Sequence, residues 1–311
     1  MAFYNLKRNC SVYLVTSIYG SLQQFKLDVY PDLTFSQTFD EQALDVKTLH
    51  DQDAMFEDAV INKANPASFG FTILLTNSAA HISVGDMLTN KNASRDGSVE
   101  ALYSGDLYID TGVDIFKLTK AVFERGTYQI AKASIITVSV SGSASKLERW
   151  AASGTTIPGT PVTTTATVSG IIPRATNVVL DGIALPNIVS ISLELANEVS
   201  WLPYDTLHKS LAVTGPTDTM YPGAFIVSSK TLSGTIQQYV TSTNESRLQS
   251  WSTNSNLTIQ VGDVGNYFFN VVIPSVVFSN RLDPQELFIQ TYDFRMRSNP
   301  SNLTTVIDYV F

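Results

Sequence analysis

The sequence predicts a mainly β protein, and three observations support this. Most periodic segments alternate apolar and polar residues with period two and are rich in Val, Ile, Thr, Phe and Tyr, which is typical of strands. Segments with helical spacing are few. Short residue runs of the first half also recur, in the same order, in the second half. We therefore expect a mainly antiparallel protein with a short helix or two in each half.

The clearest alternation lies in residues 33–40. Leu33, Phe35, Gln37 and Phe39 would face one side of a strand, and the residues between them the other. Residues 190–195 repeat this arrangement. Further strands are expected at residues 69–76, 128–140, 235–241, 266–278 and 287–297. Helices are expected at residues 143–152, where Leu147 and Trp150 share a face, and at residues 245–252, with Leu248 and Trp251.

A Pro-, Gly- and Thr-rich segment at residues 153–167 marks the strongest change in composition. It reads either as a linker or as an edge strand. We place a domain boundary there, which gives domains 1–155 and 156–311. The first domain has 13 Lys and Arg against 17 Asp and Glu, and the second has 7 against 11, so each carries −4.

Three blocks of matched residues predict that the two halves arose by duplication. Thr48-Leu49-His50 matches Thr206-Leu207-His208, with the flanking strand pattern in the same register. Ala59-Val60-Ile61 then matches Ala224-Phe225-Ile226. Finally, Gly126-x-Tyr128-x-Ile130 matches Gly265-x-Tyr267-x-Phe269.

Composition excludes several classes of protein. Charged residues make up 15% of the chain, against a usual value of ~25%, while 44% of residues are hydrophobic, so the chain is not disordered. A net charge of −8 disfavours a protein that grips nucleic acid. The single Cys10 excludes an internal disulfide framework. Neither a secretory leader nor a membrane-spanning segment is recognised, so we expect folding in a cytoplasm and no membrane anchor.

No catalytic constellation emerges. His50 and His208 occupy equivalent repeat positions and could serve a metal or acid–base site, but without a neighbouring histidine or cysteine the pattern favours loop histidines that hold turns; His81 is interpreted in the same way. Asp51-x-Asp53 starts like a calcium loop, which Met55 and Phe56 then break. Nucleophile, phosphate-loop and zinc motifs are absent. We expect no enzyme, no cofactor and no metal.

Several runs of the first half resemble tail tube proteins of long-tailed (siphovirus-type) bacteriophages, most closely the kind with two tube domains in one chain. The runs are Leu-Thr-Phe-Ser-Gln-Thr-Phe-Asp-Glu-Gln (33–42), Lys-Thr-Leu-His-Asp (47–51), Phe-Glu-Asp-Ala-Val-Ile (56–61) and Lys-Ala-Asn-Pro-Ala-Ser-Phe-Gly-Phe-Thr-Ile-Leu-Leu (63–75). The second half supplies the matching blocks at residues 206–208 and 224–226.

This resemblance implies two tandem tail-tube-like antiparallel β-sandwich or half-barrel domains, each with a short flanking helix and a long inter-strand loop. It implies a structural virion protein: trimeric, pseudo-hexameric rings that stack into the conduit for viral DNA delivery. Partners would be further copies of the chain, the tape measure, terminator and distal tail proteins, and double-stranded DNA that passes without tight binding. The protein would belong to the virion tail and be assembled in the host cytoplasm.

Two sets of residues are candidates for contacts in such a tube. The polar strand faces would line the lumen, because acidic or neutral walls do not hold phosphates; the alternative is that they face outer solvent. The loops 41–58 and 199–223 would reach the next ring; the alternative is that they pack on their own domain. The lumen candidates are Thr34, Ser36, Thr38, Asp40, Ser192 and Glu194. The inter-ring candidates are Asp45, Asp51, Asp53, Trp201, Tyr204 and Tyr221.

Two alternatives to a tube subunit remain open. A distal tail, hub or terminator protein would be a related ring component with the same fold. A two-domain carbohydrate-binding or adhesin-like β-sandwich would instead expose aromatic residues in a groove and stay monomeric.

Overall fold

The computed structural model describes residues 7–44, 58–76, 78–89, 102–131, 133–162, 175–202, 220–242, 255–263, 266–284, 286–297 and 307–308. The first half contains a 3-10 turn (Lys7–Asn9), β1 (Ser11–Thr16), β2 (Gln23–Leu27), β3 (Thr34–Ser36), β4 (Phe39–Leu44), β5 (Asp58–Ala64), β6 (Ala67–Leu74), α1 (Ala79–Thr89), β7 (Gly105–Asp110), β8 (Asp114–Ala131), β9 (Thr137–Ala144) and β10 (Lys146–Ala151). Then follow β11 (Thr160–Pro161), β12 (Ala175–Leu180), β13 (Ile183–Ala184), β14 (Ile188–Leu202), β15 (Ala224–Tyr239), β16 (Ser255–Asp263), β17 (Asn266–Pro284), β18 (Phe288–Met296) and β19 (Ile307–Asp308). The predicted mainly antiparallel β class is confirmed.

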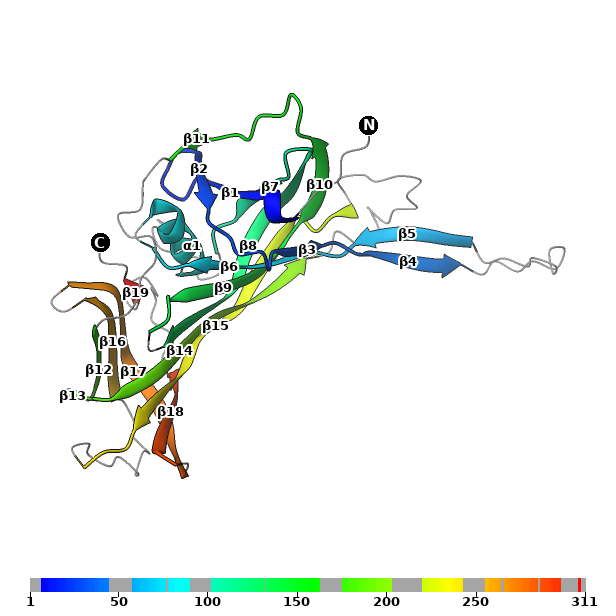
Figure 1. Ribbon diagram of the computed structural model, residues 1–311. Coiled ribbons are helices and arrows are strands. Elements are labelled where there is room, and N and C mark those ends of the chain that lie inside the picture. Colours follow the sequence, from blue (N-terminus) through cyan, green and yellow to red (C-terminus); the bar gives the residue numbers. More distant parts are fainter. Residues whose placement is uncertain are drawn as a thin grey trace, which may run out of the picture.

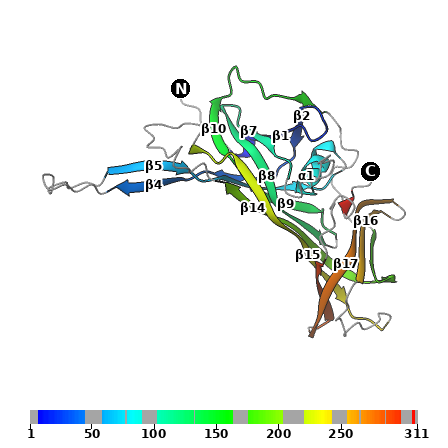
Figure 2. The same cartoon turned by 180° about the vertical axis from the view of Figure 1, so that it is seen from behind.

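One large antiparallel sheet runs through both halves of the chain (Figure 1). Its order is β3–β6–β9–β8–β14–β15–β18–β17–β16–β12–β13, and β19 adds to β17. A smaller group, β10, β7, β1, β2 and β11, attaches along the first part of β8, where β11 pairs with β2 in parallel. The hairpin of β4 and β5 stands apart and projects away from the body in both views (Figures 1 and 2). We call it the first arm.

The two long strands β8 and β17 play the same part in the two halves. The start of β8 pairs with β7 and its end with β9, while the start of β17 pairs with β16 and its end with β18. In both cases the register shifts by one residue near the middle of the long strand, at Gly105/Leu107 and at Ser255/Leu257. Each long strand therefore carries the chain from one layer into the shared sheet.

The remaining strand pairs of the first half also have counterparts in the second half. The pairs β1–β2, β1–β7, β6–β9 and β3–β6 of the first half have counterparts in β12–β13, β12–β16, β15–β18 and β14–β15. A bulge lies at Asp40/Glu41 between β4 and β5 and at Glu198/Val199 between β14 and β15. The end of β14 and the start of β15, residues 199–202 and 224–227, thus correspond to the first arm and form a second arm.

At one position that corresponds between the halves, a phenylalanine lies opposite a glycine on the neighbouring strand. The two halves place these two residues on opposite strands of the pair. Phe69 on β6 lies opposite Gly142 on β9, whereas Gly234 on β15 lies opposite Phe294 on β18. A Cβ on Gly142 would lie 2.6 Å from Phe69 Cζ, and a Cβ on Gly234 would lie 2.6 Å from Phe294 Cζ. The glycine in each pair therefore makes room for the ring opposite it.

The third block of the sequence comparison is wrong in register. Tyr128 lies opposite Val138 in the second part of β8, whereas Tyr267 lies at the start of β17, opposite Gly262. The position on β17 that corresponds to Tyr128 is Leu282, opposite Gln290. The sequence match paired two Gly-x-aromatic runs from different parts of these long strands.

The core lies on one face of the shared sheet, as the alternation predicts. Tyr128, Leu193, Ile236 and Phe294 are buried there, and one apolar cluster extends across both halves. Helix α1 covers part of the first half's core with Val84, Met87 and Leu88. Within the described ranges, no helix is long and apolar enough to cross a bilayer.

Two predictions on helices have different outcomes. The predicted helix at residues 143–152 is wrong, because this segment ends β9 and forms β10, which pairs along β8 with Trp150 opposite Ile115. The predicted helix at residues 245–252 lies outside the described residues. The structure instead contains α1, whose residues from Ala80 to Thr89 are almost all buried and give no polar face for a sequence pattern to reveal.

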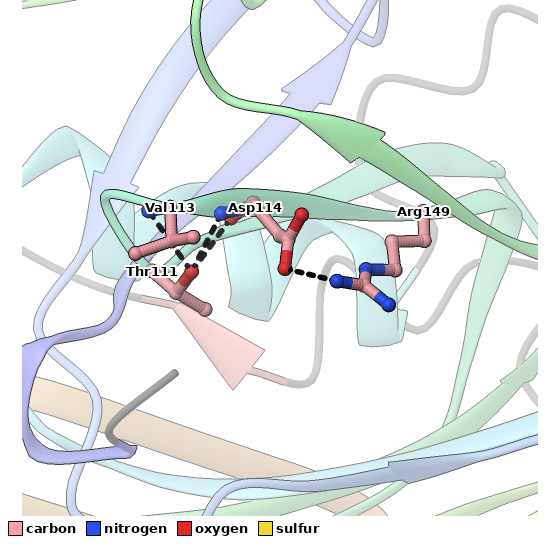
Figure 3. Close-up of polar contacts among 4 residues, drawn as sticks. All are labelled: Thr111, Val113, Asp114 and Arg149. Atoms are coloured by element: carbon pink, nitrogen blue, oxygen red, sulfur yellow. Dashed lines mark hydrogen bonds and ion pairs between the residues drawn. The ribbon is translucent and has the colours of Figure 1, made fainter. Parts of the chain in front are cut away.

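The turn between β7 and β8 is fixed by side chains (Figure 3). Thr111 Oγ1 accepts hydrogen bonds from the backbone N–H groups of Val113 and Asp114, at 3.3 and 2.9 Å, and donates to the Asp114 carbonyl at 2.9 Å. Arg149 on β10 forms an ion pair with Asp114 at 2.8 Å. These contacts hold β7, β8 and β10 together at the end of the smaller layer.

His81 is a buried residue of α1. Its Nδ1 accepts a hydrogen bond from the Thr76 backbone N–H at 3.0 Å, which agrees with the expectation that it holds a turn. Desolvation by burial lowers the pKa of His81 from 6.5 to about 4, although the charge of Asp28 opposes this. The folded protein therefore holds this imidazole neutral at physiological pH.

Acidification should destabilise the fold through His81. The unfolded chain protonates this histidine below pH ~6.5 and the folded chain only below about 4, so stability is full above pH 6.5 and falls between these values. The loss should reach about 3 kcal/mol at most. Urea unfolding of the wild type and His81→Gln at pH 7 and pH 5 measures it. The variant should lose less on acidification than the wild type, and equal losses would contradict this account.

Candidate functional site: the polar face of the shared sheet

The face of the shared sheet opposite the core is lined with small polar side chains. The alternation that turns Phe35, Tyr128 and Leu193 to the core side turns their neighbours to the other side. These neighbours are exposed or partly exposed: Thr34, Ser36, Ser68, Thr72, Arg125, Thr127, Gln129, Ser139, Ser141, Ser192, Glu194, Ser233, Thr235, Asp293 and Arg295. We call this surface the polar face.

Hydrogen bonds between adjacent strands hold the polar face together. The Ser36 and Ser68 hydroxyls lie 3.0 Å apart, as do those of Thr72 and Ser139. Thr235 donates to Asp293 at 3.0 Å. Cross-strand hydroxyl pairs of this kind stabilise the pairing of the strands.

Charge on the polar face is sparse and balanced. Its residues named above include two basic and two acidic side chains. Arg125 Nε lies 3.1 Å from Glu194 Oε1, and at the edge of the sheet Lys63 Nζ lies 3.5 Å from Asp40 Oδ2. Asp40 also accepts a hydrogen bond from Asn65 at 2.8 Å. A face without a basic cluster offers phosphates no strong electrostatic hold.

The two halves meet where β8 pairs with β14, which we call the joint. Residues from Arg125 to Ala131 lie opposite residues from Ala196 to Ser190 in an unbroken antiparallel register. On the core side, Tyr128 lies opposite Leu193, and both are fully buried. On the polar side, Gln129 donates to Ser192 at 3.1 Å, beside the Arg125–Glu194 pair. The polar face therefore crosses the joint without interruption.

The second arm packs on the first half of the same chain. Trp201 Nε1 donates to Ser143 on β9 at 2.6 Å, and its ring lies 5.2 Å from that of Phe225. Ser145 donates to the Pro222 carbonyl at 2.5 Å, and Lys120 donates to that of Gly223 at 2.8 Å.

Tyr221 is buried at the base of the first arm. Lys146 Nζ lies 4.9 Å from the centre of its ring, and the ring of Phe39 lies 6.4 Å away. Ala64, Met220 and Tyr221 form a small apolar cluster there. The two arms therefore touch where the first arm leaves the body.

The predicted site residues fall into two groups. Of the lumen candidates, Thr34, Ser36, Ser192 and Glu194 share the polar face, and Thr38 and Asp40 continue it as exposed residues towards the first arm. Trp201 and Tyr221 contact the first half of their own chain; that they also reach another ring stays a prediction. The candidates Asp45, Asp51, Asp53 and Tyr204, and the histidines His50 and His208, lie outside the described residues.

The residue runs of the sequence did not reveal that β6, β8 and β9 complete the polar face between the two predicted stretches. The signal was present as alternating hydroxyls at Ser139 and Ser141. Within the described ranges, no group of three or more His, Cys, Asp or Glu residues is placed to bind a metal. Lys117, 3.0 Å from Asp106 and 5.5 Å from the Trp150 ring centre, forms a packed surface cluster on the smaller layer.

The chain matches a known protein family along nearly its whole length. Residues 2–310 match the model of the Bacteriophage Baseplate Tube Protein Family, which is nearly the whole chain. No curated protein shows a significant match to the chain.

Apolar burial should hold the joint more strongly than its ion pair. Leu193→Ala removes a fully buried side chain and should lower the free energy of unfolding by about 2–5 kcal/mol. Glu194→Gln, the neighbouring substitution, breaks only a half-exposed ion pair and should cost less than about 1 kcal/mol. Urea unfolding of the two variants measures both. A Glu194→Gln variant as unstable as Leu193→Ala would show that charge holds the joint.

Proposed function

Because this chain belongs to the Bacteriophage Baseplate Tube Protein Family, a family of structural tail and baseplate tube proteins, we propose that it is the tube subunit whose stacked rings carry viral DNA. The observation that carries this proposal is the polar face, which continues across the joint from one half of the chain to the other. Such a face, repeated around a ring, makes a wetted wall of hydroxyls with balanced charge. DNA can slide past a wall of this kind because nothing on it grips phosphate.

The matching strand pairs of the two halves support a tandem duplication with one tube domain in each half, residues 1–155 and 156–311. The matched bulges at Asp40/Glu41 and Glu198/Val199 and the exchanged Phe–Gly pairs support the same division. If each domain is one unit of a six-fold wall, three copies complete a ring. The β-sandwich or half-barrel character of each domain, and a siphovirus-type tail, belong to this proposal.

The sheet edges support closure of the ring between copies. Among the described residues, β3 pairs only with β6, and the end of β17 pairs only with β18. The corresponding strands β14 and β8 pair with each other at the joint. Leu282, which corresponds to the fully buried Tyr128, is 39% exposed. We therefore place the end of β17 of one copy against β3 of the next, since open edges readily pair with a further chain.

Within the virion, the rings would contact the tape measure, terminator and distal tail proteins and would be assembled in the host cytoplasm. The family description also favours a second candidate, a tube ring within the baseplate, because it names that part of the particle. The number of copies per virion separates the two. A major tail tube protein is among the most abundant virion proteins, whereas a baseplate ring contributes few copies.

Electron microscopy of the purified chain tests self-assembly. At high concentration we expect rings or tubes of constant diameter, with class averages that have six-fold pseudosymmetry and a mass of three chains per ring. A strictly monomeric protein under all conditions, or rings with another number of chains, would contradict the proposed assembly.

Charge reversal on the polar face tests the conduit. In phage carrying Asp40→Lys and Glu194→Lys, tubes should still form, but DNA delivery should fall by an order of magnitude or more, because new basic side chains would hold phosphates. Infection and in vitro ejection assays measure delivery. Lys26→Glu, an exposed position on β2, is the control. Normal delivery by the double variant would remove these residues from the lumen.

A further inference from the structure

The second arm and its seat on the first half give a template for the first arm, which projects from the body (Figures 1 and 2). The seat of the second arm contains Ser143 and Ser145, which contact Trp201 and Pro222. If the halves correspond as proposed above, a like seat exists on the second half, and only another copy can supply the arm that fills it.

Strand register identifies the two residues of that second seat. Ser143 lies opposite Ser68, and Arg295 lies opposite Ser233, which corresponds to Ser68. Two residues further on, the Ser145 N–H bonds the Thr119 carbonyl at 2.9 Å, and the Arg297 N–H bonds that of Ser275 at 3.0 Å. Arg295 and Arg297 therefore stand where the first half has two serines.

At the matched positions of the two arms, the second arm has the large residues and the first arm has the small ones. Trp201 lies opposite Phe225 three residues beyond the bulge at Glu198, and Ala43 lies opposite Ala59 three residues beyond the bulge at Asp40. The first seat thus combines small serines with an arm that carries Trp and Phe. The second combines two long arginines with an arm that carries two alanines at the same register positions. In both halves a large residue type on one side is thus matched by a small one on the other.

Charge is complementary as well. On the two strands of the first arm, Glu41 and Asp58 are acidic, while Asp40 at the base of the arm is already paired with Lys63. The second half has only seven Lys and Arg residues, and two of them, Arg295 and Arg297, form the seat at the end of β18, whereas Arg281 on β17 pairs with Asp283 at 3.2 Å. An acidic arm attracts a basic seat, whereas two seats of like charge repel each other. Electrostatics therefore favours contacts in which the arm of one copy meets the seat of another.

We propose that the first arm of one copy lies on Arg295 and Arg297 of a second copy, so that it covers Arg295 at the end of the polar face and this arginine does not face the lumen. The contact is heterologous, because arm and seat are different surfaces, so it joins copies head to tail. It also explains why the first arm is acidic and the second is aromatic: the first must find its seat in solution, whereas the second is tethered to its seat by the chain. This inference rests on the proposed function and assigns the partner surface within the assembly.

A charge exchange tests the seat in the full-length chain. Arg295→Glu with Arg297→Glu should raise the concentration needed for assembly on the order of tenfold or more, as should Glu41→Lys with Asp58→Lys in the arm. Copies that carry all four substitutions should recover much of the loss. Sedimentation and electron microscopy measure assembly, and Lys26→Glu is the matched control. Rings that form normally with both arginines reversed would overturn the seat and leave the proposed function standing.

Cross-linking decides the seat even if no rings form. In a Cys10→Ser background, Ala43→Cys and Arg295→Cys should be joined between copies by a short bis-maleimide and run as linked dimers and higher species. Ala43→Cys with Lys26→Cys should give far less product. Linked species at the control level only would overturn the seat. A strong link without rings would instead support the seat and count against the tube.

Discussion

The backbone pairing of β8 with β14 is the constraint on which the rest of the structure depends. An antiparallel strand edge must bond either another strand or water, and here the first half offers its open edge to the second. Because side chains alternate along both strands, this pairing aligns two cores on one side and two polar surfaces on the other. A slip of β14 by one residue would turn Leu193 towards solvent and put Glu194 into the core.

The same pairing extends one polar surface across both halves of the chain. The polar face is made of short hydroxyl side chains that bond across strands, as Ser36 does with Ser68 and Gln129 with Ser192. Two of its charged residues, Arg125 and Glu194, form an ion pair. Such a surface is wetted but has little affinity for anions, which suits a wall better than a binding site.

Differences between the halves are as informative as their likeness. Phe69 and Gly142 exchange places in Gly234 and Phe294, so the volume at this position is kept while its source changes. The proposed arm seats follow the same rule, with Ser143 under Trp201 in one half and Arg295 paired with Ala43 in the other. A duplicated chain can change its two contacts separately, because one is made within the chain and the other between copies.

The sequence by itself determined the β class, the strand at residues 190–195 and its polar and apolar sides, because period-two alternation is a local signal. The expected strand at residues 33–40 is divided into β3 and β4, and Phe39, expected on its apolar side, is exposed. The sequence failed at α1, which is buried on nearly all sides and so has no amphipathic pattern, and at residues 143–152, where the spacing of Leu147 and Trp150 fits a helix but the backbone pairs with β8. It also misaligned Tyr128 with Tyr267, since short motifs carry no register. Only the tertiary structure decided that β6, β9 and β8 complete the polar face, that Trp201 rests on Ser143, and that Arg295 stands at the position of that serine. These relations depend on which strands bond to each other, and hydrogen bonds between residues more than fifty positions apart leave no trace in local spacing.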